Sequence, residues 1–179
     1  LTNALTLRRE LQKRGCLFQS TSDTEVVTHL IALSEASTVE ERLIDALRQI
    51  EGAYSFVCLT NTAVFGVRDP LGVRPLVLGK SGNAHILCSE TCALDIIGAE
   101  FVRDVEPGEL IILSHDGSVR SLHPFPRQNA RFCIFEYIYF ARPDSNMEGH
   151  SVYEVRKRIG AQLAIESPVD CDVVVPVPD

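Results

Sequence analysis

The first fifty residues carry apolar side chains at helical spacing. Leucines recur between positions 5 and 11, and Gly15 supplies a stop, so a first helix is predicted there. Residues 22–25 have the S-x-x-E spacing of a capping box ahead of an apolar run, which predicts a second helix. A third helix is expected after Thr38, with one apolar stripe made of Leu43, Ile44, Leu47 and Ile50.

The pattern then shortens to that of strands. Apolar runs separated by turns rich in Gly, Pro, Asn and Asp predict strands rather than helices. Because the turns are short, neighbouring strands are expected to pair antiparallel. The expected strands cover 53–60, 63–68, 74–78, 85–89, 101–105 and 109–113.

The last third of the chain changes character again. A proline-containing connector at 122–131 leads to an aromatic segment at 132–140 and a polar loop at 142–150. A helix is predicted over 151–166, and a final strand begins near Asp172. We expect a domain boundary near Pro124, giving domains 1–124 and 125–179. The predicted helix is expected to face inward through Val152, Val155, Ile159, Leu163 and Ala164.

Composition narrows the class of protein. Apolar residues make up 45% of the 179, which excludes a mainly disordered chain, and the net charge of −7 argues against binding nucleic acid. No apolar run reaches the length of a membrane span, and the start is not a signal peptide, so we expect a soluble protein. The six cysteines are scattered without C-x-x-C spacing, which favours small core residues in a reducing compartment over disulfides.

Few residues stand out for chemistry. Asp23 lies at a predicted helix start, where a carboxylate either caps the helix or binds a ligand's ammonium group, and spacing alone leaves both readings open. The turn 68–76 contains two arginines suited to pairing with carboxylates. The aromatic segment after Cys133 is too apolar to leave in water and indicates a domain interface. Phosphate loops and zinc-ligand spacings are missing from the sequence.

One segment carries a specific resemblance. The run FEYIYFARPDS at 135–145 resembles the signature of the amidophosphoribosyltransferase family. The S/T-D-x-E and P-G-E pieces are shared with other N-terminal-nucleophile glutaminases, whereas the aromatic run is much more specific. Supporting motifs follow in family order: LTNA at 1–4, TSDTE at 21–25, EGAYS at 51–55, RDP to RPL at 68–76, SETCAL at 89–94 and EPGE at 106–109.

The resemblance implies a fold and an activity. The implied fold class is α+β: an N-terminal-nucleophile (Ntn) glutaminase, a four-layer αββα sandwich truncated at its N-terminus, followed by the start of an α/β phosphoribosyltransferase domain. In this family an N-terminal cysteine attacks glutamine, and the released ammonia displaces pyrophosphate from phosphoribosyl pyrophosphate with the help of magnesium. The product, 5-phosphoribosylamine, is the first committed intermediate of purine synthesis.

The resemblance also assigns individual residues. Leu1 follows the family's oxyanion segment, so the nucleophile, the oxyanion donors and the carboxylate-binding arginine are expected upstream of this chain, which is then an inactive fragment. Asp23 matches the aspartate that binds the α-amino group of glutamine. Cys133 matches the first ligand of an iron–sulfur (4Fe-4S) cluster that only one branch of the family holds. Residues 176–179 are expected to lead into a pyrophosphate-contacting loop.

Partners and alternatives follow from the same comparison. The family implies glutamine and phosphoribosyl pyrophosphate as substrates, a homo-oligomer (dimer or tetramer) inhibited by purine nucleotides, and a cytoplasmic or plastid location, with no nucleic acid or membrane. A first alternative is the glutaminase portion of another Ntn amidotransferase such as glucosamine-6-phosphate synthase. A second is a non-catalytic module that binds glutamine or another subunit.

Overall fold

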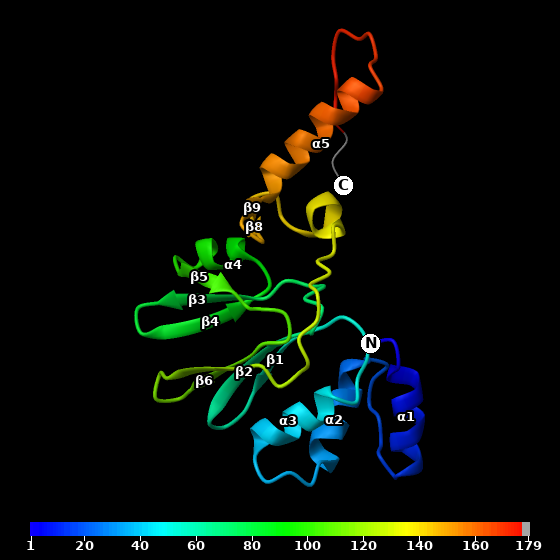
Figure 1. Ribbon diagram of the computed structural model, residues 1–179, viewed down its shortest axis with the longest axis vertical. Coiled ribbons are helices and arrows are strands. Elements are labelled where there is room, and N and C mark those ends of the chain that lie inside the picture. Colours follow the sequence, from blue (N-terminus) through cyan, green and yellow to red (C-terminus); the bar gives the residue numbers. More distant parts are fainter. Residues whose placement is uncertain (177–179) are drawn as a thin grey trace.

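The computed structural model describes residues 1–176 (Figure 1). The chain opens with three helices: α1 (Ala4–Lys13), α2 (Thr24–Leu33) and α3 (Val39–Leu47). Seven strands and a short helix follow: β1 (Ser55–Leu59), β2 (Ala63–Arg68), β3 (Val77–Ser81), β4 (Ala84–Cys88), α4 (Thr91–Ile96), β5 (Glu100–Asp104), β6 (Leu110–Ser114) and β7 (Val119–Leu122). The last elements are a π-helical turn, η1 (Glu136–Phe140), the hairpin β8 (Asn146–Met147) and β9 (His150–Ser151), and α5 (Val152–Glu166).

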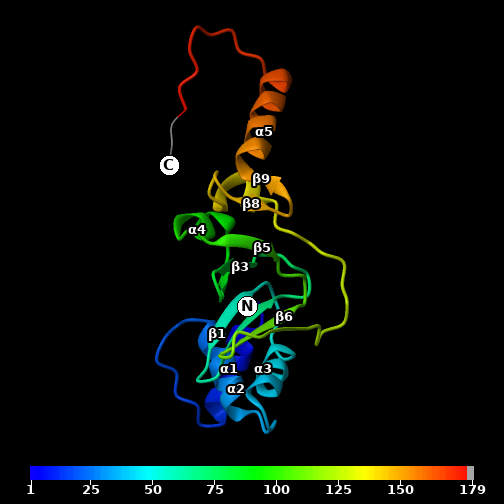
Figure 2. The same cartoon turned by 90° about the vertical axis from the view of Figure 1, so that its left-hand side faces the viewer.

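Two antiparallel sheets form the centre of the fold. One has the strand order β1-β2-β6-β7 and the other β4-β3-β5. Helices α1–α3 cover the outer side of the first sheet, and α4 lies on the outer side of the second (Figures 1 and 2). Between the sheets the backbone at Gly66 approaches Leu87 so closely that a Cβ would lie 2.5 Å from the leucine Cδ1. A small apolar cluster seals this space: Leu76, Leu78, Val105 and Ile111.

The three N-terminal helices confirm the sequence prediction, but one capping prediction is wrong. Helix α3 begins with a true capping box, in which Thr38 accepts from the Glu41 amide and Glu41 accepts from the Thr38 amide. The S-x-x-E segment before α2 forms none, because the Glu25 carboxylate turns back to Gln19 and Ser20 instead.

The six predicted strands are present, all but β2 with shifted ends, whereas α4, β7, η1 and the β8–β9 hairpin within the predicted loop 142–150 were missed. The strand predicted from residue 74 begins at Val77, because residues 74–76 still belong to the preceding turn. Helix α4 escaped prediction because six residues are too few to show a helical period. Strand β7 is short, and its mixed sequence V-R-S-L shows no clear alternation.

The C-terminal part differs most from expectation. Helix α5 is confirmed, but the inward-facing stripe is wrong: Val152 is buried, whereas Ile159 and Leu163 are exposed. Within residues 1–176 this helix contacts η1 and β9 near its start, which leaves the rest of the stripe in solvent. Residues 172–176 form no strand, and 177–179 lie outside the described residues. None of the helices described is long and apolar enough to cross a membrane.

Candidate functional site

Asp23 stands directly before α2 but does not cap it, since its side chain makes no capping hydrogen bond. Its Oδ2 lies 2.5 Å from the backbone nitrogen of Leu1. The Leu1 side chain is 2% exposed, whereas the Asp23 side chain is 48% exposed. The carboxylate therefore lies against the backbone of Leu1 and keeps about half of its surface open to solvent.

The loop before Asp23 is fixed by Glu25. Its carboxylate accepts hydrogen bonds from the Gln19 amide (2.7 Å), the Ser20 amide (2.9 Å) and the Ser20 hydroxyl (2.6 Å). These bonds, led by the Ser20 hydroxyl, lower the pKa of Glu25 to about 2. Arg8 donates to the Ser22 carbonyl from the other side at 3.0 Å. The loop thus holds Asp23 at a defined position although it lies on the surface.

Residues 1–3 are held by backbone contacts to Glu51 and Gly52, which we call the clip. The Thr2 amide donates to the Glu51 carbonyl at 2.8 Å, and the Asn3 side chain accepts from the Glu51 amide at 2.9 Å. Gly52 has φ +119, and a Cβ there would lie 3.1 Å from the Thr2 nitrogen and 3.3 Å from the Leu1 Cα. Only glycine combines that φ with so close an approach. The E-G-A-Y-S motif therefore serves to seat the segment beside Asp23.

A cavity of about 320 Å³ adjoins this clip, lined among others by Glu51, Gly52, Tyr54 and Asp69. Asp69 is fully buried, and the Tyr54 carbonyl accepts from the Asp69 amide at 2.9 Å. Burial, and then the Asp69 carboxylate, raise the pKa of Tyr54 far above its ordinary value. Tyr54 therefore stays neutral and keeps its ring in the core.

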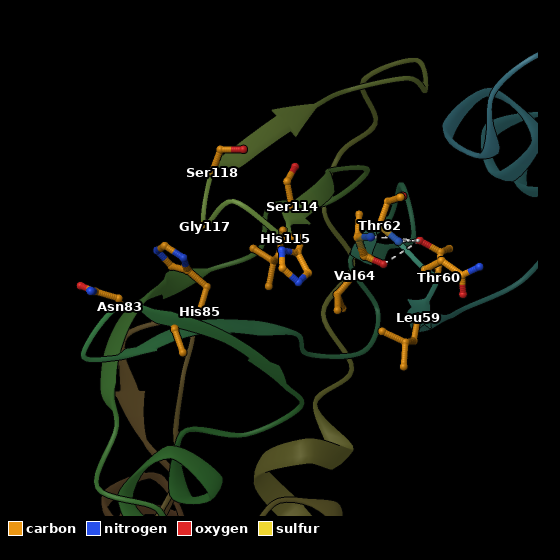
Figure 3. A pocket seen from close by; sticks show the side chains of 14 residues that line it. Leu59, Thr60, Thr62, Val64, Asn83, His85, Ser114, His115, Gly117 and Ser118 are labelled. Carbon is orange, nitrogen blue, oxygen red and sulfur yellow. Dashed lines mark hydrogen bonds between the residues drawn. The ribbon is translucent and has the colours of Figure 1, made fainter.

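A second cavity, of about 310 Å³, opens between the tips of three hairpins (Figure 3). His85 and His115 are its titratable side chains; the remaining lining residues are neutral, among them Thr62, Ser114 and Ser118. The cavity contains no carboxylate, thiol or amine among its lining residues. It offers no charged partner that would orient either histidine as a general base. We therefore assign no chemistry to it.

Comparison with known proteins identifies the domain that contains Asp23. Residues 1–95 match a family model described as a glutamine amidotransferase domain. The chain belongs to this family. Asp23, Glu25, Gly52 and Tyr54 all lie inside the matched range, so the Asp23 carboxylate and the clip are parts of a glutamine amidotransferase domain.

Individual relatives are similar along almost the whole chain. It is 57% identical to the amidophosphoribosyltransferase of Rhizobium etli and 50% identical to the chloroplastic amidophosphoribosyltransferase 1 of Arabidopsis thaliana, over 99% and 100% of its length. A solved glutamine phosphoribosylpyrophosphate amidotransferase from Bacillus subtilis, complexed with ADP and GMP, superimposes with a TM-score of 0.91 at 42% identity over 95% of the chain. The chain spans about a third of these proteins: 37%, 32% and 37% of their lengths.

The cysteines of the chain are spread over several elements. All six are free thiols. Burial raises the pKa of Cys58 and of Cys88, which is the opposite of what an activated nucleophile requires. Cys133 is half-buried, and its amide donates to the Val73 carbonyl at 3.1 Å. Residues 1–176 contain no group of three or more side chains able to hold a metal, so Cys133 has no companion ligand there.

Proposed function

We propose that this chain is part of an amidophosphoribosyltransferase. The observation that carries the proposal is the combination of 42–57% identity with a TM-score of 0.91 across essentially the whole chain, including the segment beyond residue 95. The reaction has two halves. Glutamine and water give glutamate and ammonia; ammonia then forms a C–N bond to phosphoribosyl pyrophosphate as pyrophosphate leaves.

Asp23 is proposed to bind the α-ammonium group of glutamine. The support is physical: about half of its side chain faces solvent, and the Glu25 carboxylate fixes the loop that carries it. An ion pair of this kind orients the amino-acid end of the substrate and leaves the side-chain amide free to react. We propose that the nucleophilic cysteine is none of the six in this chain, and we expect the chain alone to hydrolyse no glutamine.

The domain organisation is proposed on the same basis. Residues 1–124 would form an Ntn glutaminase sandwich of four αββα layers, supported by helices on the outer side of each of two facing sheets. Residues 125–179 would be the connector and the beginning of a phosphoribosyltransferase domain. The exposed apolar stripe on α5, with Ile159 and Leu163, is the surface that such a domain would bury.

The family implies two cofactors, magnesium and, in one branch, a 4Fe-4S cluster. Magnesium would assist the departure of pyrophosphate, and no cluster of ligands within residues 1–176 fits it. A 4Fe-4S cluster takes four thiolate ligands. Cys133 would supply one of them, and the residues described provide no other beside it, so they do not by themselves fit the group. Iron and sulfide analysis of the anaerobically purified gene product tests this.

The proposed location is the cytoplasm or a plastid, in keeping with the bacterial and chloroplastic relatives, and the proposed assembly is a homo-oligomer. The deciding experiment supplies the full-length gene product with glutamine, phosphoribosyl pyrophosphate and magnesium. We expect one pyrophosphate released for each glutamate formed. Glutamate coupled instead to amination of fructose 6-phosphate would identify a glucosamine-6-phosphate synthase. Glutamine binding without turnover would identify a non-catalytic module.

A further inference from the structure

Two parts of the chain that are distant in sequence meet at one turn. We call residues 68–76, which follow β2, the corner, and residues 131–151, which include η1 and the β8–β9 hairpin, the docking segment. The Arg131 amide donates to the Leu71 carbonyl at 2.7 Å, and the Cys133 amide donates to the Val73 carbonyl at 3.1 Å. The docking segment therefore begins by pairing with the corner.

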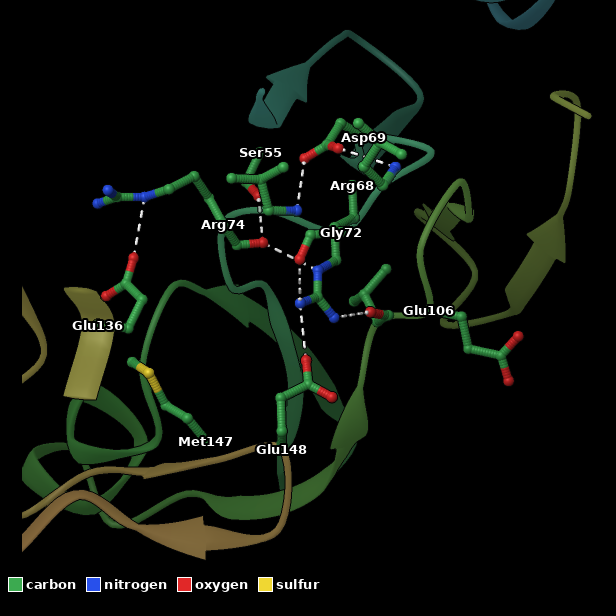
Figure 4. Close-up of polar contacts among 12 residues, drawn as sticks. Ser55, Arg68, Asp69, Gly72, Arg74, Glu106, Glu136, Met147 and Glu148 are labelled. Atoms are coloured by element: carbon green, nitrogen blue, oxygen red, sulfur yellow. Dashed lines mark hydrogen bonds and ion pairs between the residues drawn. The ribbon is translucent and has the colours of Figure 1, made fainter. Parts of the chain in front are cut away.

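Arg68 is the centre of this contact (Figure 4). Its side chain is 2% exposed and donates to three carbonyls, those of Gly72 (2.9 Å), Arg74 (2.8 Å) and Val105 (2.8 Å). A fourth hydrogen bond runs from Nη2 to Glu148 Oε1 at 2.7 Å, across 80 residues of sequence. The three carbonyl bonds fix the guanidinium within the glutaminase part, so only the fourth bond reaches the docking segment.

Glu148, the partner of Arg68, has an unfavourable backbone conformation. It lies in the β8–β9 turn with φ 47, and among residues 1–176 it is the only non-glycine residue with positive φ. Glycine, which follows at Gly149, takes this conformation without strain. A glutamate in this strained conformation indicates that its carboxylate, which accepts the hydrogen bond from Arg68, is functionally required.

Further bonds join the same two parts. Arg74 Nε lies 2.9 Å from Oε1 of the buried Glu136 in η1. The Glu90 carboxylate, just before α4, accepts from the Arg142 amide at 2.9 Å and from the Ser145 hydroxyl at 2.8 Å. These contacts hold the docking segment against the corner and the start of α4. Glu90 contributes a single side chain just before α4, whereas Arg68 is also hydrogen-bonded to the carbonyls of Gly72, Arg74 and Val105.

Hydrogen bonds also connect the corner with the residues next to the Asp23 site. Asp69, next to Arg68, accepts from the Tyr54 amide through Oδ2 at 3.4 Å and donates its own amide to the Tyr54 carbonyl at 2.9 Å. Tyr54 follows the Gly52 clip that seats the residues beside Asp23. A continuous set of packed and hydrogen-bonded groups thus runs from the glutamine-binding side to Glu148.

We propose that Glu148 is a positioning residue: through Arg68 it holds the docking segment in register with the glutaminase domain, so that ammonia made from glutamine is delivered to the acceptor site. This rests on the proposed function, which requires two sites in fixed relation. Without the ion pair the two half-reactions would each persist, but ammonia would escape to solvent. The quantity that changes is then the ratio of glutamate formed to pyrophosphate released.

The test uses the full-length gene product with Glu148→Gln, which keeps the size of the side chain and removes its charge. We expect glutamate per pyrophosphate to rise at least about threefold, within the range found for residues that couple two sites. Ammonium-driven pyrophosphate release is expected to stay within about twofold of the unmodified enzyme, since no reacting group is touched. Glu35→Gln is the matched control, an exposed glutamate without an ion pair, and should leave the ratio unchanged.

Glu148→Gly separates positioning from a merely local role. It relieves the backbone strain, so a residue that serves only to shape the turn would be replaced without loss. The proposal predicts the same uncoupling as for Glu148→Gln. Tight coupling in both variants would overturn it. If the unmodified enzyme itself releases no pyrophosphate with glutamine, the proposed function fails, which is a distinct result.

Discussion

Asp69→Asn is expected to destabilise the chain strongly although it changes one atom. Asp69 is fully buried; its Oδ1 accepts from the Leu71 amide at 2.9 Å and its Oδ2 from the Val73 amide at 3.1 Å and the Tyr54 amide at 3.4 Å. Asparagine replaces one oxygen by an NH₂ group, so in either orientation at least one backbone N–H faces a second donor.

The magnitude follows from these bonds. A hydrogen bond to a charged group contributes about 1.5–3 kcal/mol, and leaving its buried partner unsatisfied costs a similar amount, so we expect a total loss of about 2–4 kcal/mol. With a urea m-value of about 2 kcal/mol/M the unfolding midpoint should fall by about 1–2 M. The corner that carries Arg68 would be loosened at the same time.

Urea unfolding followed by circular dichroism measures this loss. Asp116→Asn is the matched control: Asp116 makes a similar local turn, accepting from the Ser118 amide at 2.9 Å and its hydroxyl at 2.6 Å, but it is exposed. Its midpoint should move by only a small fraction of the Asp69→Asn shift. Equal shifts for the two variants, or no shift for Asp69→Asn, would refute the argument from burial.

Other outcomes follow from single positions. Gly79→Ala places a Cβ 2.4 Å from Leu94 Cδ2 and should lower the free energy of unfolding, measured by thermal denaturation, by about 1–3 kcal/mol. Gly160→Ala lies in open space on α5 and should raise it by up to about 1 kcal/mol. Equal losses for the two variants would contradict the packing described. The hydrogen bonds to the Glu25 carboxylate stabilise the loop before Asp23. This stabilisation is complete at pH values above 4.5, the ordinary pKa of glutamate, and should be lost as the pH falls toward about 2, the lowered pKa of Glu25. Carboxyl titration by NMR checks this, and a Glu25 midpoint near 4.5 would contradict it. The chain alone should form no thioester with a glutamine analogue, as mass spectrometry would show.

Elements governed by local pattern could be predicted from the sequence. The first three helices and six of the strands have clear periods, and pairing of the two corner arginines with carboxylates followed from charge alone. The partners themselves, Glu136 and Glu148, could not be predicted, because they lie 62 and 80 residues away and depend on how the docking segment folds back.

Where the sequence prediction was wrong, a competing interaction explains it. Glu25 satisfies the S-x-x-E pattern, but two amides and a hydroxyl of the preceding loop outcompete the helix start for its carboxylate. The apolar stripe of α5 has helical spacing, yet spacing says only that a face is apolar and not which element covers it. The role of Gly52 was missed, since its close approach to Thr2 joins residues 50 positions apart.

The most direct test of the central claim is Asp23→Asn in the full-length gene product, with pyrophosphate release measured against glutamine and, separately, against ammonium. Losing one charge-assisted ion pair should raise the KM for glutamine about 10- to 100-fold. The ammonium-driven rate should stay unchanged, as should both rates in the control Asp95→Asn on the exposed side of α4. An unchanged KM for glutamine, or an equal loss of the ammonium-driven rate, would contradict the assignment of Asp23 as the residue that holds the glutamine ammonium group.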